Sequence, residues 1–303
     1  MKTVTGQTVR FPLAAYGTRV NSLPAAVTAV GFNLLKEPIS RARDGAEIPG
    51  TVGLFRSDDG GCVGIHGAGF TYLQPHETLE TLERARQEIG GDWCSVAVLK
   101  GGRGLSASIS LQTEVVAPKR GDRLGLSVLL LDSFDGSKRC QFKLVANVLA
   151  CNNGMVTRES LFTFAEKHTS SLRDRAVAME GRLLDSLRVQ VQEMQETVTA
   201  LDSRDMSREE VIGFANRLFP AADERAVPTR VQNNRDAVVT GFFRGAGNVG
   251  RTRWDAFNAV TEHLDWNGTF RETEHSREDN RFESILSGSA AGVRSRALEL
   301  LLN

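Results

Sequence analysis

Three groups of basic residues in this 303-residue chain stand where short apolar runs give way to turn residues. In chain order these groups are Lys100 and Arg103, then Lys119, Arg120 and Arg123, then Lys138 and Arg139. Lysine and arginine at neighbouring turns can hold phosphate groups through charge, without reading base sequence. Composition favours this interpretation no more than the simpler one, in which basic side chains in turns are only solvated.

No set of residues has the spacing of a catalytic centre. The five histidines form no pair at metal-binding spacing, and no serine stands in a G-x-S-x-G turn. Two carboxylate pairs, Asp58 with Asp59 and Glu209 with Glu210, stand at a turn and a helix start, where solvation or capping accounts for them. We expect no catalytic residue and no metal site; an enzyme acting on nucleic acid through dispersed carboxylates is a weaker alternative.

Residues 245–250 read GAGNVG and match the G-x-G-x-x-G spacing of dinucleotide-binding turns. Such a turn also needs a second parallel strand that ends in an acidic residue about 20 positions later. The chain instead continues with WNGTFRETEHSRED, which has no strand core. We therefore expect no small-molecule cofactor, and interpret the segment as a mobile glycine-rich loop whose amides are available to an anion.

The totals limit the class of protein. Lys plus Arg and Asp plus Glu each number 37, so a polyanion site must be local rather than a property of the whole chain. The hydrophobic content of 41% is enough for a core. No run of about 18 apolar residues occurs, and the N-terminus lacks the apolar core of a signal peptide. We expect a cytoplasmic protein without membrane contact.

The four cysteines, Cys62, Cys94, Cys140 and Cys151, lack the close pairs of zinc or redox motifs. We interpret them as reduced thiols that serve as small buried hydrophobes rather than as reactive groups.

The elements that would position the basic groups form a β-meander. Its four expected strands are Trp93–Leu99, Leu105–Val116, Arg123–Phe134 and Arg139–Leu149. Asp135 and Gly136 form a strong hairpin signal between the last two. Because alternate turns of a meander fall at opposite ends of the sheet, the first and third basic groups are predicted to share an edge. Phe134 and Phe142 lie near the third turn as candidate base-stacking surfaces.

The polarity of the second expected strand alternates. Leu105, Ala107, Ile109 and Leu111 alternate with Ser106, Ser108, Ser110 and Gln112, which predicts an antiparallel sheet covered on one side.

Helices surround this sheet in the predicted fold. Apolar residues recur at a mean spacing of about 3.6 from Leu172 to Leu201, which predicts one long helix of roughly 45 Å. Shorter helices are expected at Pro75–Ile89, at Ser207–Leu218 behind a capping box, at Arg253–Leu264 and at Gly292–Leu302. The charged segment Arg271–Arg281 has the composition of a surface loop.

The fold class is therefore α+β, with an antiparallel β-meander packed against helices. We divide the chain into an irregular, proline-containing N-terminal arm (1–50), an α+β core with the meander and the long helix (51–205), and a helical C-terminal region (206–303).

Four collinear stretches resemble the phage- and plasmid-related proteins of the domain of unknown function 932 family. They read LLLDSFDGSKRCQFKL, VLACNNGMV, EKHTSSLRDRA and GRTRWDAFNAVTEHLDW, within a match over roughly residues 60–300. The matching positions are Asp135, Gly136, Ser137, Cys151, Asn153, Gly154, Lys167, His168, Thr169, Thr252, Trp254, Asn258, Ala259, Thr261 and Glu262. Relatives often carry an arginine shortly before the cysteine, where this chain has Val148 or Ala150. If that arginine contacts a ligand in relatives, either Lys143 replaces it or the contact is absent in this chain.

The resemblance implies a mobile-element origin and no established reaction. Its meander followed by long helices also looks like the core of phage single-strand annealing proteins, an analogy of architecture that does not fix function. Our leading hypothesis is a non-enzymatic protein of a phage or prophage that binds and anneals single-stranded DNA as a homo-oligomer. The first candidates for phosphate contact are Lys100, Arg103, Lys138 and Arg139, followed by Lys167 and His168; Trp254 and Asn258 are assigned to structure. The alternative is a scaffold or host-interaction protein that uses its long helix and N-terminal arm.

Overall fold

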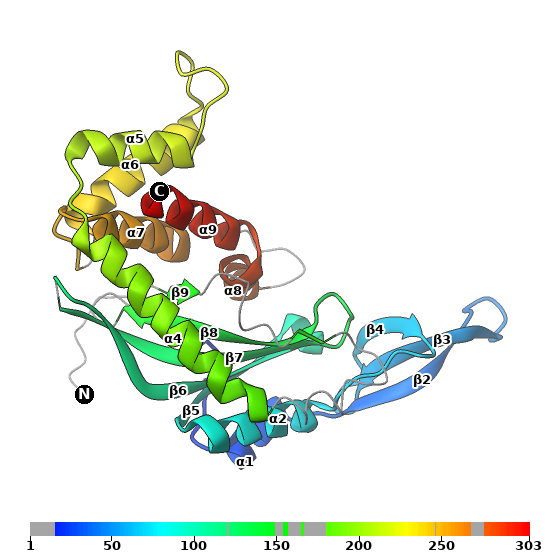
Figure 1. The fold of residues 1–303 in the computed structure, drawn as a ribbon. Helices are drawn as coiled ribbons and strands as arrows, with labels where there is room; N and C mark the ends of the chain where they lie inside the picture. The colour runs from blue at the N-terminus through cyan, green and yellow to red at the C-terminus, as the bar shows by residue number, and fades with distance from the viewer. Residues whose placement is uncertain are drawn as a thin grey trace, which may run out of the picture.

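The meander lies at the centre of the molecule (Figure 1). The computed structural model describes residues 16–119, 121–148, 154–156, 165–166, 180–245, 247–267 and 276–303. The main sheet is antiparallel and runs in the order β1-β5-β6-β7-β8-β10, with β9 also paired to β8. Its strands are β1 (Thr18–Arg19), β5 (Asp92–Leu99), β6 (Gly104–Ala117), β7 (Asp122–Ser133), β8 (Cys140–Val148), β9 (Gly154–Val156) and β10 (Ala165–Glu166). Strands β5 to β8 confirm the four predicted strands, each end within one residue.

Both faces of this sheet are covered by helices. Leu105 and Ile109 of β6 are buried on the face that packs against α2 (Pro75–Ile89) and α4 (Glu180–Ser203). The opposite face carries Ser106 and Ser108, which are also buried. On that face, apolar residues of α8 (Arg277–Ser287) pack on Leu129, Leu131 and Val145. The predicted one-sided cover is therefore wrong, because alternation of apolar and small polar residues does not tell whether a helix covers the polar face.

Helix α2 confirms its predicted bounds. Gln74 forms a capping box with Glu77, Pro75 occupies the first turn, and the helix ends at Gly90. Glu83 then ties the helix to the sheet, because its Oε2 accepts a 2.7 Å hydrogen bond from the indole nitrogen of Trp93 in β5.

Helix α4 is the predicted long helix, here 24 residues over Glu180–Ser203. The part of the apolar stripe from Leu172 to Met179 lies outside the described residues. Met194, Val198 and Leu201 are buried, as the spacing predicted. The side-chain amide of Gln195 donates to the carbonyl of Val116 (2.7 Å) and accepts from its N–H (3.0 Å), which fastens α4 to the far half of β6.

The C-terminal region is helical. Its elements are α5 (Arg208–Leu218), α6 (Thr229–Arg244), α7 (Arg253–Glu262), the π-helical turn η3 (His263–Asn267), α8 and α9 (Ser289–Leu302). Helices α5, α7 and α9 confirm predictions, and Trp254 in α7 is fully buried. The predicted surface loop Arg271–Arg281 is wrong in its last part, because α8 begins at Arg277 with Ser276 as its N-cap. A buried ion pair between Asp265 and Arg294 (2.5 Å) joins η3 to α9.

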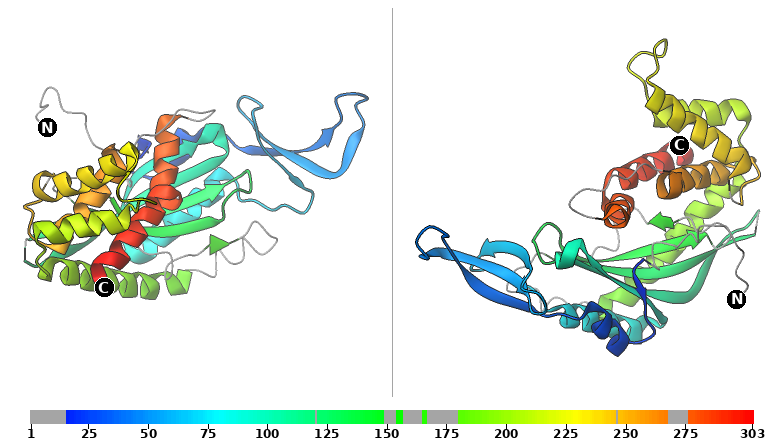
Figure 2. Two further views of the ribbon diagram at one scale, coloured as in Figure 1. Left: turned by 90° about the horizontal axis from the view of Figure 1, so that it is seen from above. Right: turned by 180° about the vertical axis from the view of Figure 1, so that it is seen from behind.

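A second, three-stranded sheet extends from the body of the molecule (Figures 1 and 2). This projecting sheet consists of β2 (Leu34–Ser40), β3 (Glu47–Arg56) and β4 (Cys62–Gly67), all antiparallel. It follows α1 (Leu23–Val30), a short helix that packs on α2 and β5. The irregular arm predicted for 1–50 is thus regular over much of the described residues 16–50, and its strands continue past residue 50.

A candidate nucleic-acid interface at one end of the main sheet

The first and third basic groups meet at one end of the main sheet, as predicted. The turn after β5 is η2 (Lys100–Gly102), and the turn after β7 covers 134–139. Lys100, Arg103 and Lys138 line the same small cavity, together with Phe282 and Glu283 of α8. Arg139 follows Lys138, is exposed, and directly precedes β8.

Glu283 lies between the two lysines. One carboxylate oxygen is 2.6 Å from Lys100 Nζ, and the other is 2.9 Å from Lys138 Nζ. Partial burial raises the pKa of Glu283, but the hydrogen bonds and charges of the two lysines outweigh it, so the pKa is below its ordinary value. The carboxylate is therefore ionised at neutral pH and occupies the place of an anion bound between two cations.

The turn that carries Lys100 is strained and held by α8. Among the described residues, Lys100 is the only non-glycine residue with positive φ, at 51°. Its N–H donates to Asp279 Oδ2 (3.1 Å), and Tyr16 donates its hydroxyl hydrogen to the other oxygen of Asp279 (2.9 Å). Burial, followed by the charge of Asp279, raises the pKa of Tyr16, so this phenol stays a donor. Asp279 thus fixes the backbone from which Lys100 reaches Glu283.

The opposite wall is the Asp-Gly-Ser turn between β7 and β8. Asp135 Oδ1 accepts from the N–H of Ser137 (2.9 Å), an Asx turn, and Gly136 has a φ of 74°. Ser133 Oγ accepts from the Lys138 N–H (2.8 Å) and donates to the Lys138 carbonyl (2.9 Å). These bonds fix the backbone of Lys138, so both lysines start from ordered main chain.

A buried carboxylate lies beneath this end of the sheet. Asp132 accepts from the hydroxyl of Thr78 in α2 (2.9 Å) and from the N–H of Ser133 (2.9 Å). The cavity above it has a volume of about 20 Å³, which is room for about one water molecule. A phosphate group therefore requires that the carboxylate of Glu283 leave its place.

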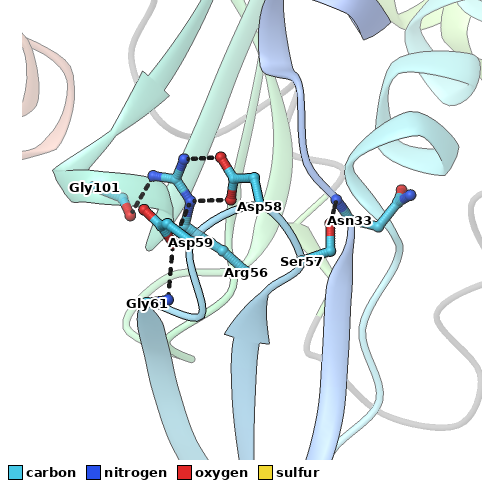
Figure 3. A network of polar contacts seen from close by, with 7 residues as sticks. All are labelled: Asn33, Arg56, Ser57, Asp58, Asp59, Gly61 and Gly101. Atoms are coloured by element: carbon cyan, nitrogen blue, oxygen red, sulfur yellow. Dashed lines mark hydrogen bonds and ion pairs between the residues drawn. The ribbon is translucent and has the colours of Figure 1, made fainter.

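The base of the projecting sheet is fastened to the same η2 turn (Figure 3). Arg56, at the end of β3, forms two hydrogen bonds with Asp58 (3.0 and 2.5 Å) and donates to the carbonyl of Gly101 (3.2 Å). Its guanidinium also stacks over Phe32, with Cζ 4.5 Å from the ring centroid. One three-residue turn therefore contacts the projecting sheet and carries a lysine of the basic site.

The second basic group lies at the other end of the sheet. Lys119 forms an ion pair with Asp205 beyond α4, and its N–H donates to Asp202. Arg123 pairs with Glu114 on the neighbouring strand. Both charges are paired with nearby carboxylates, and both residues lie apart from the end that carries Lys100 and Lys138. Their own predicted role in DNA binding stays a prediction. Arg120, Lys167 and His168 lie outside the described residues, and their predicted roles stay predictions.

The predicted stacking role of Phe134 and Phe142 is wrong. Both rings are fully buried in the main core, where no base can reach them. Proximity to a turn in sequence did not show which face of the sheet each ring occupies.

The cysteines support the prediction of inert thiols only in part. Burial, followed by the charge of Asp132, raises the pKa of Cys140, and burial also raises the pKa of Cys94. Cys62 is exposed, contrary to the prediction, and Cys151 lies outside the described residues.

The GAGNVG loop is held by an internal carboxylate. Asp255 of α7 accepts hydrogen bonds from the N–H groups of Val249 (3.3 Å), Arg251 (2.8 Å) and Thr252 (3.1 Å). The side chain of Asn248 also donates to the carbonyls of Gly241 and Asp255. Within the loop itself, the amide of Val249 contacts the chain's own aspartate, and those of Gly245 and Asn248 donate to backbone carbonyls, so these three are not available to an anion as predicted.

Lys143 is engaged with α8 and is not available as a replacement for the family's arginine. It is buried, and its Nζ donates to the carbonyl of Leu286 (2.8 Å) in the last turn of α8. The positive charge of Lys143 also interacts favourably with the negative, C-terminal end of the α8 helix dipole.

The described residues contain no group of three or more histidine, cysteine or acidic side chains that could hold a metal ion. None of the helices in that part of the chain has the length and apolar character needed to cross a membrane.

A comparison with known protein families shows which family contains this region of the chain. The family model described as "Domain of unknown function (DUF932)" matches residues 63–286. The chain belongs to this family. The match spans the DUF932 region from β4 to α8 and so includes both lysines and Glu283. No curated protein and no solved structure matches the chain, so the likeness to annealing proteins remains an expectation.

Sequence reasoning missed the acidic half of the site. Glu283 and Asp279 come from α8, and its first turn was interpreted as a loop because Arg277–Arg281 is strongly charged. A signal was present: Ser276 and Asp279 have capping spacing, and Phe282, Ile285 and Leu286 follow at helical spacing. Nothing in the sequence paired this helix with the lysines, because the contact joins distant segments.

Proposed function

We propose that this protein binds single-stranded DNA at the end of the main sheet and promotes annealing as a homo-oligomer. In this proposal it acts without catalysis in recombination or replication of a phage or prophage, in the cytoplasm of the bacterial host. The observation that carries the proposal is the pair Lys100 and Lys138, which two separate turns bring to one carboxylate. A phosphate that displaces Glu283 would meet both ammonium groups, with Arg103 on the same cavity wall and Arg139 next along the chain.

The mechanism is one of positioning. Backbone phosphates replace the carboxylate of Glu283 between the lysines, while the bases remain outside the small cavity and free to pair. Binding of this kind depends on salt and has little sequence preference. Neighbouring subunits of the homo-oligomer would extend the path of the strand.

A labelled single-stranded oligonucleotide, titrated by fluorescence anisotropy at 50 and 200 mM salt, tests this function. The double variant Lys100→Gln with Lys138→Gln is expected to bind at least about tenfold more weakly and to lower the salt slope by about 1.4, for two lost phosphate contacts. The matched control is Lys119→Gln with Arg123→Gln, at the other end of the sheet. Absence of binding by the unaltered protein at low salt, or equal losses in both double variants, would refute the proposal.

The alternative, a non-catalytic scaffold or host-interaction protein of a mobile element, is favoured by one observation. The projecting sheet exposes large apolar side chains, including Leu35 and Ile65, and such faces commonly bind proteins. Intact oligomers that never retain DNA would favour this alternative. Metal-dependent loss of the oligonucleotide would indicate an enzyme instead.

A further inference from the structure

One face of the projecting sheet is apolar and is exposed at several of its described residues. Register places Leu35, Phe55 and Cys62 in one row across the three strands, and Glu37, Gly53 and Ile65 in the next. Leu35 is 45% exposed and Ile65 is 62% exposed. Exposed apolar patches on a protein surface commonly mark the places where partners bind, so this face is expected to be covered by a partner.

The face is also closed and continuous. A Cβ atom at Gly53 would lie 2.5 Å from the ring of Phe55 and 2.7 Å from Cδ1 of Ile39. The two side chains therefore close over the glycine, and the strands present one apolar surface.

The projecting sheet is held firmly at its base. The side-chain amide of Gln74, the N-cap of α2, accepts from the N–H of Leu34 (2.8 Å) and donates to its carbonyl (2.9 Å). Arg56 adds the contacts with Asp58, Gly101 and Phe32 described above. A surface held in this way loses little conformational entropy when it binds.

An apolar groove of about 590 Å³ lies at the far end of α2. Its walls are the end of α2, the bulged part of β6 and the first half of α4. Its lining includes the apolar residues Ile89, Leu111, Leu187 and Val191 and the polar residues Arg188 and Gln192. In the described part of the chain, β5 pairs with β6 only as far as Ser110, so the strand edge beside the groove lacks a β5 neighbour.

The two surfaces are complementary in charge. Glu37 is the single charged residue in the two apolar rows of the projecting sheet, and it is exposed. Arg188 lines the groove with a side chain 76% exposed, and its ion pair with Asp185 is long, at 3.9 Å. An apolar face with one carboxylate thus matches an apolar groove with one guanidinium.

The projecting sheet cannot reach the groove of its own chain. Helix α2 begins beside the base of the sheet and ends at the groove, and its 15 residues span roughly 22 Å of rigid helix. We propose that the apolar face of the projecting sheet docks into the α2–α4 groove of a second copy of this chain. The contact is head-to-tail, so repetition produces a ring or a filament. It specifies how the subunits of the proposed annealing protein join, and in that sense rests on the proposed function.

Sedimentation velocity without DNA tests the contact. Glu37→Arg and Arg188→Glu are each expected to weaken self-association by about tenfold, and the double variant is expected to recover most of the loss. Two matched controls reverse a charge elsewhere on the same elements. Glu47→Arg changes an exposed residue of β3 in the projecting sheet, and Glu193→Arg changes an exposed residue on the same helix as Arg188. A monomer at all concentrations, or no recovery in the double variant, would overturn the proposal.

The exposed Cys62 provides a direct readout. Gln192→Cys in the groove is expected to form an intersubunit disulfide with Cys62 on mild oxidation, and the added change Cys62→Ser should abolish it. The control is Gln232→Cys, exposed on α6, which should not crosslink to Cys62. Failure of Gln192→Cys to crosslink in an oligomeric sample would place the interface elsewhere.

Oligonucleotide binding measured on the same samples separates the two proposals. Oligomers that depend on Glu37 and Arg188 but do not bind DNA refute only the proposed function. DNA binding by a strictly monomeric protein refutes only the subunit contact.

Discussion

Lys143 and Leu286 are joined by a 2.8 Å hydrogen bond from the buried ammonium to the backbone carbonyl at the end of α8. This bond holds the helix on the serine-rich face of the meander. Because α8 carries Glu283 and Asp279, the position of the whole acidic half of the interface depends on it.

Replacement of this lysine should therefore destabilise the fold. Lys143→Met is expected to lower the free energy of unfolding by about 1–3 kcal/mol, because a buried carbonyl loses a charged donor. Urea denaturation measures the change. Arg296→Met, which removes a similar but exposed bond to the carbonyl of Arg217, should cost no more than about 0.5 kcal/mol. Equal costs would contradict the structural role of Lys143.

Removal of the carboxylate between the lysines should strengthen DNA binding. In the proposed function, Glu283→Gln takes away the carboxylate that a phosphate has to displace, so affinity for a single-stranded oligonucleotide is expected to rise about threefold to tenfold at low salt. Anisotropy titration provides the measurement. Glu278→Gln, exposed on the same helix, is the control and should leave the affinity nearly unchanged. A decrease in affinity for Glu283→Gln would show that the carboxylate does not compete with DNA.

The buried ion pair of Asp265 and Arg294 should be sensitive to loss of one partner. Asp265→Asn leaves a guanidinium buried without its charge partner and is expected to cost about 3–5 kcal/mol of stability. The exposed pair of Asp223 and Arg225 gives a matched control, for which Asp223→Asn should cost at most about 1 kcal/mol. Chemical denaturation of both variants compares them directly, and similar losses would contradict the difference in burial.

Acid should weaken the contact between α2 and β5. The pKa of Glu83 is lowered to about 2, chiefly by hydrogen bonds from Arg86. Burial raises this pKa, and the hydrogen bond from Trp93 lowers it further. Since the folded pKa lies below the unfolded value of about 4.3, this stabilisation is complete above that value and is lost as pH falls toward 2. Glu83→Gln should therefore flatten the loss of stability between pH 5 and 2, and Glu80→Gln, exposed on the same helix, should not. Parallel curves for the unaltered protein and Glu83→Gln would refute the assignment.

The sequence predicted what is local. Alternation and turn residues located β5 to β8 to within one residue, and Pro75 with Gly90 bounded α2. The shared edge of Lys100 and Lys138 also followed, because meander topology fixes which turns lie together.

What the sequence did not reveal depends on long-range contacts. The carboxylate of Glu283 reaches the lysines only after α8 has packed on the serine-rich face of the sheet. The strand β2 contains Pro38, after which its register with β3 shifts, and this pairing joins segments that carry no common motif. The pattern within a strand also could not show that Phe134 and Phe142 point into the covered core.

The η2 turn has a thermodynamic consequence. Gly101 receives the hydrogen bond of Arg56 from the projecting sheet, and the adjacent Lys100 contacts both Asp279 and Glu283. A shift of these three residues changes the energy of both contacts at once. If the turn moves when Glu283 is displaced, strand binding and subunit joining are linked, and linkage is reciprocal: each must alter the equilibrium constant of the other by the same factor. DNA would then regulate the size of the assembly, and protein concentration would regulate the affinity for DNA.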